Sequence, residues 1–197
     1  MPEFQIRNRQ DAAREYLRRR RARTSLVDYT RYTKRGYVPG DIHFEFSKIL
    51  GRVISGECKR LMISVPPRHG KTEHASIRLP GLFFGHYPDR NIISAAYNSD
   101  RAGDVGREVR DLLASPEHRI LFPEASLLPR SNARDRMHTV SGGAYFAGGV
   151  GSAMTGRGAH LLLIDDPYKN RVEADSLATQ NRVYSWYLST AYTRLER

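Results

Sequence analysis

The chain has 197 residues, which is long enough to bury a substantial core, and 40% hydrophobic and 27% charged residues are ordinary globular usage. Its single cysteine, Cys58, excludes an intrachain disulfide and a cysteine-based zinc site and favours a reducing, cytosolic setting. The sequence contains no run of 18 or more apolar residues and no signal-like start. We therefore expect no membrane role.

Positive charge is concentrated at the front of the chain. The net charge is +11, and residues 1–36 hold eleven Lys or Arg against four Asp or Glu, a net of +7. Arginines at 18–21 and 23 are followed by Tyr29 and Tyr32, a basic and aromatic mixture that suits contacts with nucleic-acid phosphates. A solvated helix or a subunit contact remains an alternative. We predict a basic, mainly helical segment over 1–36 and a second domain over 37–197.

Hydrophobic periodicity predicts an alternating order of helices and strands, with an irregular connection over 115–138. The expected helices are 9–23, 43–55, 72–84 and 98–113; the expected strands are 61–65, 91–97 and 161–164, with a hairpin over 139–147. The helix 43–55 is expected to place its apolar residues roughly on one face, namely Phe44, Phe46, Ile49, Leu50 and Val53. Strands separated by helices imply parallel pairing. The expected class is α/β, with a mostly parallel sheet flanked by helices.

The motif Pro66-Pro-Arg-His-Gly-Lys-Thr72 follows the apolar run 61–65 and is suited to bind phosphates. Backbone N–H groups at a helix start attract anions, and Gly70 allows close approach of the backbone. Lys71 would contact the β- and γ-phosphates and Thr72 would bind Mg²⁺. Val65 stands where the usual pattern has glycine, so an ordinary strand-to-helix connection is the alternative. The predicted nucleotide-binding residues are Pro67, Arg68, His69, Gly70, Lys71 and Thr72.

A second motif, Leu161-Leu-Leu-Ile-Asp-Asp166, is an apolar strand that ends in two carboxylates. Such a strand is expected to deliver Asp165 to the Mg²⁺ of a bound nucleotide. Taken alone, such a run followed by Asp-Asp-Pro is most often a strand that enters a turn, since Asp and Pro both favour turns. Ligands of parallel sheets bind beyond the carboxyl ends of the strands, so the two motifs should meet at one edge. Together they favour an ATPase that uses ATP and Mg²⁺.

Several motifs in order resemble the ATPase half of the large terminase subunit of tailed bacteriophages. They are Pro66–Thr72, Ala95-Ala-Tyr-Asn-Ser99, Gly142-Gly-Ala-Tyr-Phe-Ala-Gly-Gly149, Thr155-Gly-Arg-Gly158 and Leu162-Leu-Ile-Asp-Asp-Pro167. The resemblance spans about 43–196 and implies a P-loop NTPase fold of the ASCE or RecA-like type. It also implies a motor that drives double-stranded DNA into a procapsid in the cytoplasm of the infected bacterium, as a homo-oligomeric ring on a portal protein with a small terminase subunit.

The resemblance also implies roles for individual residues beyond Lys71 and Thr72. Arg68 matches an arginine that is thought to read the γ-phosphate, and Asp165 matches the aspartate associated with Mg²⁺. Asp166 stands where most relatives have a glutamate that orients the attacking water, and it is one methylene shorter. Arg157 lies where some terminases supply an arginine to the neighbouring subunit's nucleotide; an exposed turn or a DNA contact is the alternative. The expected catalytic residues are Asp166, Arg68 and Arg157.

Relatives of this kind continue into further strands and a nuclease domain of the RNase H type. We expect no nuclease activity from these 197 residues and a sheet whose last strands lie outside them. Two other functions remain open: a helicase-like ATPase, and a non-catalytic or weakly catalytic DNA-binding or assembly fragment with a terminase-like fold. His43 is expected either to border the adenine or simply to occupy the end of its helix.

Overall fold

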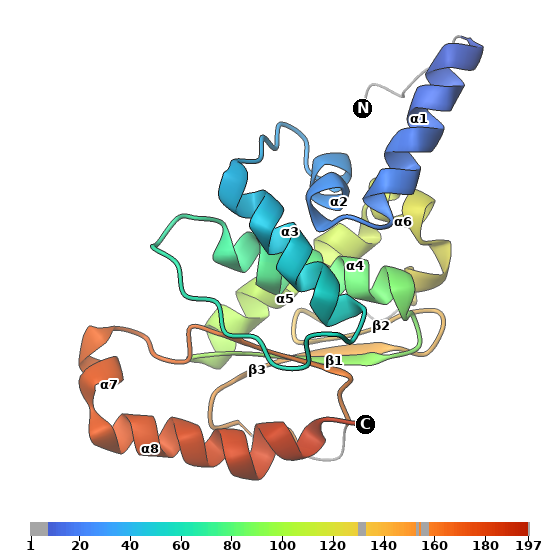
Figure 1. Cartoon of the computed structure of the whole chain (residues 1–197). Helices are drawn as coiled ribbons and strands as arrows, with labels where there is room; N and C mark the ends of the chain where they lie inside the picture. Colours follow the sequence, from blue (N-terminus) through green and yellow to red (C-terminus); the bar gives the residue numbers. More distant parts are fainter. Residues whose placement is uncertain (1–7, 130–132, 153, 155–157, 197) are drawn as a thin grey trace.

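The computed structural model describes residues 8–129, 133–152, 154 and 158–196. A central sheet carries helices α3, α4 and α5 on one side and α8 on the other (Figure 1). The helices are α1 (Arg9–Ala22), α2 (Leu26–Thr33), α3 (Asp41–Ile54), α4 (Leu79–His86), α5 (Ser99–Ala114), α6 (Pro116–Leu121), α7 (Arg171–Asp175) and α8 (Leu177–Trp186). Two π-helices, η1 (Thr72–Arg78) and η3 (Tyr187–Ala191), and two 3₁₀ turns, η2 (Pro123–Ala125) and η4 (Tyr192–Arg194), complete the helical elements. In the described part of the chain, no helix combines the length and the apolar character needed to cross a membrane.

The sheet has the strand order β2-β3-β1-β4. Its strands are β1 (Asn91–Ala96), β2 (Arg136–His138), β3 (Ala144–Gly149) and β4 (Leu161–Asp165). β1 pairs in parallel with both β3 and β4, whereas β2 pairs antiparallel with β3. The register aligns Ala96 with Gly149 on one side and with Asp165 on the other, so the carboxyl ends of three strands meet at one edge. The predicted α/β class is confirmed, with a sheet that is mixed.

The two faces of the sheet contribute to two apolar clusters. Ile92 and Leu161 belong to the main core, which also contains buried residues of α2, α3, α4 and α5. Their neighbours on the opposite face, Ala95 and Leu162, pack with Trp186 of α8. This alternation is what period-two patterning predicts for a strand that is covered on both faces. The layered core therefore holds the carboxyl ends of β1, β3 and β4 in fixed positions.

The expected strand 61–65 is wrong, because this segment belongs to no strand of the sheet. Its residues do alternate, with Ile63 and Val65 partly buried against the main core and Met62 exposed. Alternation reports which side chains face the core, whereas a strand also needs a hydrogen-bonded neighbour. Residues 61–66 take part in no such ladder with the described residues. They still lead directly into the turn before η1.

The expected apolar face of the helix 43–55 is also only partly right. Phe46, Leu50 and Ile54 are the buried residues of α3, whereas Phe44 and Ile49 are 47% and 37% exposed. A stripe at spacing four is narrower than the face that a simple count of apolar residues suggests. The apolar side chains of α3 that lie outside this stripe, Phe44 and Ile49, are therefore exposed on the surface.

Helix α2 was missed because it is short and lies within a strongly basic segment. The side chain of Ser25 accepts a hydrogen bond from the N–H of Asp28, which caps the helix. Leu26 and Tyr29 of this helix are buried in the main core. Helix α5 follows the prediction, since the Asn98 side chain caps it through the N–H of Arg101.

We predict opposite effects for the same substitution at two helical glycines. A Cβ on Gly106 of α5 would overlap the carbonyl oxygen of Arg134, whereas one on Gly51 of α3 would meet open space. Gly106→Ala should destabilise the fold by about 1–3 kcal/mol through overpacking. Gly51→Ala should stabilise it by about 0.5–1 kcal/mol through helix propensity. Urea unfolding measures both, and a shift of the same sign for the two variants would contradict the packing of α5.

Candidate active site

The structure brings the loop and the two carboxylates together beyond the carboxyl end of β4. The ammonium of Lys71 donates a hydrogen bond to Oδ1 of Asp166 and lies 3.1 Å from Oδ1 of Asp165. The hydroxyl of Thr72 donates to Oδ2 of Asp165 over 2.9 Å. These residues are more than 90 positions apart in the sequence. The convergence that the two motifs predict is therefore present.

The site combines a buried carboxylate with an accessible one. The Asp165 side chain is 7% exposed and the Asp166 side chain 63% exposed, with the Lys71 ammonium between them. Burial lowers the pKa of Lys71, but its hydrogen bond to Asp166 and the charge of Asp165 outweigh burial and raise the pKa overall. Lys71 is therefore a firmly charged cation. Its three N–H donors are suited to phosphate oxygens as well as to carboxylates.

The turn over residues 66–71, here named the 66–71 loop, is held by contacts within itself. Nδ1 of His69 lies 2.9 Å from the carbonyl oxygen of Pro67 and 3.1 Å from that of Pro66. Carbonyl oxygens only accept, so this nitrogen carries the proton and donates to both. Gly70 has φ +80°, a left-handed conformation that glycine adopts without steric cost. The loop is thus a compact turn that leads directly into η1.

Two non-glycine residues in the described part of the chain have a positive φ, and both are predicted catalytic residues. Arg68 has φ 65° and Asp166 has φ 45°. Such backbone conformations cost of order 1–3 kcal/mol each and are concentrated at functional sites. Asp tolerates the left-handed region better than most residues, because its short side chain can hydrogen-bond locally. The two unusual backbone conformations therefore lie within the same two motifs that the sequence predicts to form the site.

The oxygen ligands at this site fit Mg²⁺. An octahedral Mg²⁺ with ligands at 2.0–2.1 Å has neighbouring oxygens about 2.9 Å apart. Oγ1 of Thr72 and Oδ2 of Asp165 are separated by 2.9 Å. Among the described residues, no three His, Cys, Asp or Glu side chains cluster as a metal cage. Thr72 and Asp165 would thus hold an ion that takes its other ligands from water and phosphate, which is the usual habit of Mg²⁺.

Charged contacts tie η1 to the end of α2. Glu73 accepts hydrogen bonds from Lys34 over 2.6 Å and from Arg78 over 2.7 Å, and Arg78 also donates to Oγ1 of Thr33 over 2.9 Å. Burial raises the pKa of Glu73, but the Lys34 hydrogen bond and the Arg78 charge lower it overall. The carboxylate is therefore ionised at neutral pH. These bonds fix the residue that directly follows Thr72.

Three aromatic residues lie beside the 66–71 loop, and two of them, Tyr37 and His74, were not predicted from the sequence. Tyr37 donates its hydroxyl proton to His74, which is stacked on His43 at 4.7 Å between ring centroids. His43 lies at the N-terminal end of α3, as expected, and its Nδ1 accepts the N–H of Gly40. It also faces the loop, because a Cβ on Gly70 would lie 3.0 Å from its Nε2. The sequence feature that could have indicated this aromatic cluster is His74, which lies four residues after Gly70.

The remaining predicted residues are not joined to the carboxylates. Arg68 is exposed at the tip of the 66–71 loop and makes no ion pair with a described residue. Arg157 lies outside the described residues, so its predicted role in a neighbouring subunit stays a prediction. The geometry therefore supports Lys71, Thr72, Asp165 and Asp166 as the centre of the site.

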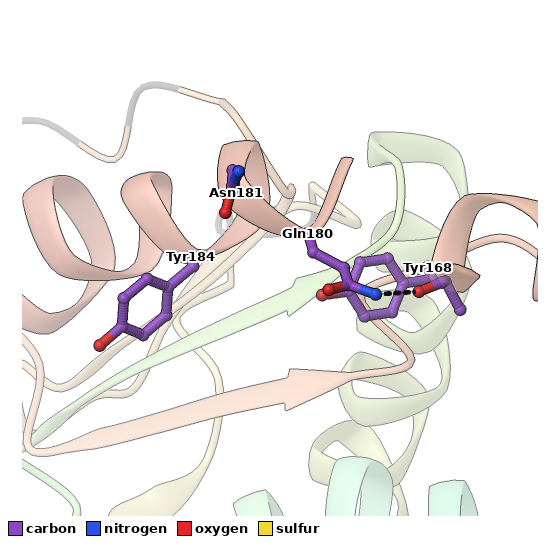
Figure 2. A pocket seen from close by; sticks show the side chains of 5 residues that line it. Tyr168, Gln180, Asn181 and Tyr184 are labelled. Carbon is purple, nitrogen blue, oxygen red and sulfur yellow. Dashed lines mark hydrogen bonds between the residues drawn. The ribbon is translucent and has the colours of Figure 1, made fainter. Parts of the chain in front are cut away.

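A separate open hollow of about 380 Å³ lies further along the chain from β4, next to α8 (Figure 2). It is lined by Tyr168, Ala174, Gln180, Asn181 and Tyr184. The amide nitrogen of Gln180 donates to the carbonyl oxygen of Ala174 over 2.6 Å. None of the lining residues is charged, so the hollow does not match a triphosphate. The candidate active site is therefore defined by the 66–71 loop and the carboxylates.

Fold and site together define an α/β protein with a lysine and two carboxylates at the carboxyl end of its sheet, a common place for ligand binding in this class. The family described as the N-terminal part of the terminase large subunit, T4likevirus-type, matches residues 62–195. The chain belongs to this family, which confirms the resemblance. No curated protein matches the chain.

Proposed function

We propose that the chain is a Mg²⁺-dependent ATP hydrolase that drives double-stranded DNA into a viral procapsid. The observation that carries the proposal is the contact of Lys71 with Asp165 and Asp166, beyond the strand ends where α/β proteins bind ligands. A loop lysine, a hydroxyl and paired carboxylates at one point are the groups that phosphoryl transfer needs. Membership of the terminase family supplies the second support.

In the proposed reaction, Lys71 exchanges its carboxylate partners for the β- and γ-phosphates. The amides of the 66–71 loop and the start of η1 bind the phosphates, since helix N-termini attract anions. Bound Mg²⁺ would neutralise charge on the phosphates while Thr72 and Asp165 hold it. Asp166, released by Lys71, would orient the attacking water and accept its proton. Its 63% exposed side chain leaves room for that water.

The proposed partners are DNA, a portal protein and a small terminase subunit, with the chain acting as a ring in the cytoplasm of the infected bacterium. Support for a DNA contact comes from α1, which projects from the rest of the chain (Figure 1). Arg14, Arg20 and Arg21 of this helix are exposed. The buried Glu15 anchors α1, because it accepts hydrogen bonds from Arg19 and from Tyr32 of α2. A firmly anchored basic helix is suited to phosphate contacts.

The test compares Mg-ATP binding and DNA-stimulated hydrolysis by the wild-type chain, Lys71→Ala and Lys48→Ala. We expect Lys71→Ala to weaken Mg-ATP binding by roughly ten- to a hundredfold and to abolish hydrolysis, because a hydrogen bond to a charged group is worth about 1.5–3 kcal/mol. Lys48 is an exposed lysine of α3, and its variant should behave as wild type. DNA binding without hydrolysis by the wild-type chain would favour the assembly protein instead.

A further inference from the structure

The carbonyl oxygen of Gly70 is held twice by one residue. It accepts the backbone N–H of His74 over 3.0 Å and is 2.9 Å from Nδ1 of the same residue. His74 is 1% exposed, and its Nε2 is 2.7 Å from the hydroxyl of Tyr37. A buried side chain with both ring nitrogens in hydrogen bonds has a fixed orientation. The peptide after Gly70 is therefore tied to the protein interior.

The hydrogen bonds fix the tautomer of His74. The Gly70 carbonyl only accepts, so Nδ1 carries the proton and donates. Nε2 of the neutral ring is then an acceptor, and the hydroxyl of Tyr37 is the donor. Burial lowers the pKa of His74 despite the opposing hydrogen bond to Gly70, and burial raises the pKa of Tyr37 to about 12. Both groups are thus neutral at pH 7.

The same bonds set the direction of the next amide. The carbonyl of Gly70 and the N–H of Lys71 belong to one planar trans peptide and point in opposite directions. Holding the carbonyl toward His74 therefore turns the Lys71 N–H away from the interior. An N–H at a helix start has no partner within the helix and is free for an anion. This amide stands at the start of η1.

His43 completes the arrangement by holding the ring of His74. The two imidazoles are stacked with 4.7 Å between centroids and 16° between planes. Nδ1 of His43 accepts the N–H of Gly40 over 2.9 Å, which fixes its own ring at the start of α3. A Cβ on Gly70 would lie 3.0 Å from His43 and 3.1 Å from His74. Both rings thus pack directly against the loop glycine.

We propose that Tyr37 and His74 are positioning residues for the nucleotide. Through the Gly70 carbonyl, they hold the peptide between Gly70 and Lys71 in its binding orientation before a phosphate arrives. A loop that is already ordered spares the ligand the cost of ordering it, so affinity depends on these two side chains. The inference rests on the proposed function, because it assumes that the 66–71 loop binds the phosphates of ATP.

The first test removes one oxygen atom that lies outside the site. Tyr37→Phe deletes the donor to His74, and Tyr87→Phe is the matched control, since its hydroxyl donates over 3.0 Å to the carbonyl oxygen of Ile54. We expect Tyr37→Phe to weaken Mg-ADP binding and raise the KM for ATP about three- to tenfold, the usual effect of one lost neutral hydrogen bond. The kcat should change less than KM. Tyr87→Phe should leave both values unchanged.

The second test reads the histidine directly in the chain without nucleotide. Nitrogen-15 NMR of the imidazoles should show His74 with its proton on Nδ1, and Tyr37→Phe should shift it toward the other tautomer. His74→Asn keeps a donor near the position of Nδ1 and should retain more Mg-ADP affinity than His74→Leu. A proton on Nε2 in the wild-type chain overturns the inference.

The failures of the inference and of the proposed function are distinguishable. A wild-type chain that binds Mg-ADP and loses binding in Lys71→Ala, but is equally affected by Tyr37→Phe and Tyr87→Phe, overturns the inference alone. A wild-type chain without affinity for Mg-ADP or Mg-ATP overturns the proposed function and the positioning role together. A selective loss of affinity in Tyr37→Phe with the expected tautomer supports both.

Discussion

Replacing Asp166 with asparagine is expected to lower ATP turnover by about 10²- to 10⁴-fold, the usual contribution of a general base. The amide cannot accept the proton of the attacking water. Mg-ATP affinity should stay unchanged or rise slightly, because Lys71 then has only the Asp165 carboxylate, and not that of Asp166, to leave when it binds the phosphates. The expected signature is therefore a loss in kcat without a loss in binding.

The substitution Asp166→Asn should leave the backbone conformation unchanged. Asp166 has φ 45°, and Asn adopts this region about as readily as Asp. Asp175→Asn is the matched control, since it removes an exposed carboxylate that pairs with Arg171 on α7. Single-turnover hydrolysis and nucleotide titration measure the two quantities. Wild-type turnover in Asp166→Asn would remove this residue from the proposed mechanism.

The variant Asp166→Glu tests whether the shorter side chain of aspartate limits the rate of ATP hydrolysis. Glutamate is one methylene longer, but it adopts a positive φ less readily than aspartate. A slight change in turnover would therefore show that carboxylate length and backbone strain offset each other.

Sequence reasoning predicted that the loop and the carboxylates meet, because one motif ends strand β4 and the other leads into helix η1. Asp165 ends a strand whose apolar run is unambiguous, and parallel topology then places such an end beside others. Lys71 and Thr72 belong to the only Gly-Lys-Thr run of the sequence. Local pattern and general topology together were sufficient to predict that these residues meet.

The parts that were missed depend on contacts between distant segments. Residues 61–65 show strand-like alternation, but no local pattern reports whether a neighbouring strand is present. Tyr37 lies 37 positions from His74, and neither residue belongs to a recognisable motif. Phe44 and Ile49 are apolar and yet exposed on α3. Burial and pairing at these positions are set by the tertiary structure.

His118 should make the fold sensitive to mild acid. It is fully buried on α6, and the hydroxyl of Tyr29 is 2.7 Å from its Nδ1. Burial lowers the pKa of His118 from its ordinary 6.5 to about 4, although a backbone contact with Ala125 opposes the shift. Burial also raises the pKa of Tyr29, so the phenol stays protonated as the donor. Folding therefore requires a neutral imidazole.

The direction of the effect follows from proton binding. Between pH 6.5 and 4 the unfolded chain binds a proton at His118 that the folded chain does not, so stability falls as the pH falls. The free energy of unfolding should be fully retained above pH 6.5 and should drop by about 3 kcal/mol by pH 4, at about 1.4 kcal/mol per pKa unit. Urea unfolding at a series of pH values measures the drop.

His118→Gln separates this histidine from the other groups that titrate on unfolding. The variant loses stability at every pH, because glutamine cannot fill the same buried space beside Tyr29. Between pH 6.5 and 4.5, the free energy of unfolding of the variant should nevertheless change less with pH than that of the wild-type chain. The carboxylates Glu15 and Glu73 have a lowered pKa and lose their contribution only below about 4.5, outside this window. Parallel pH curves for the two proteins would show that His118 is not the acid-sensitive group of the core.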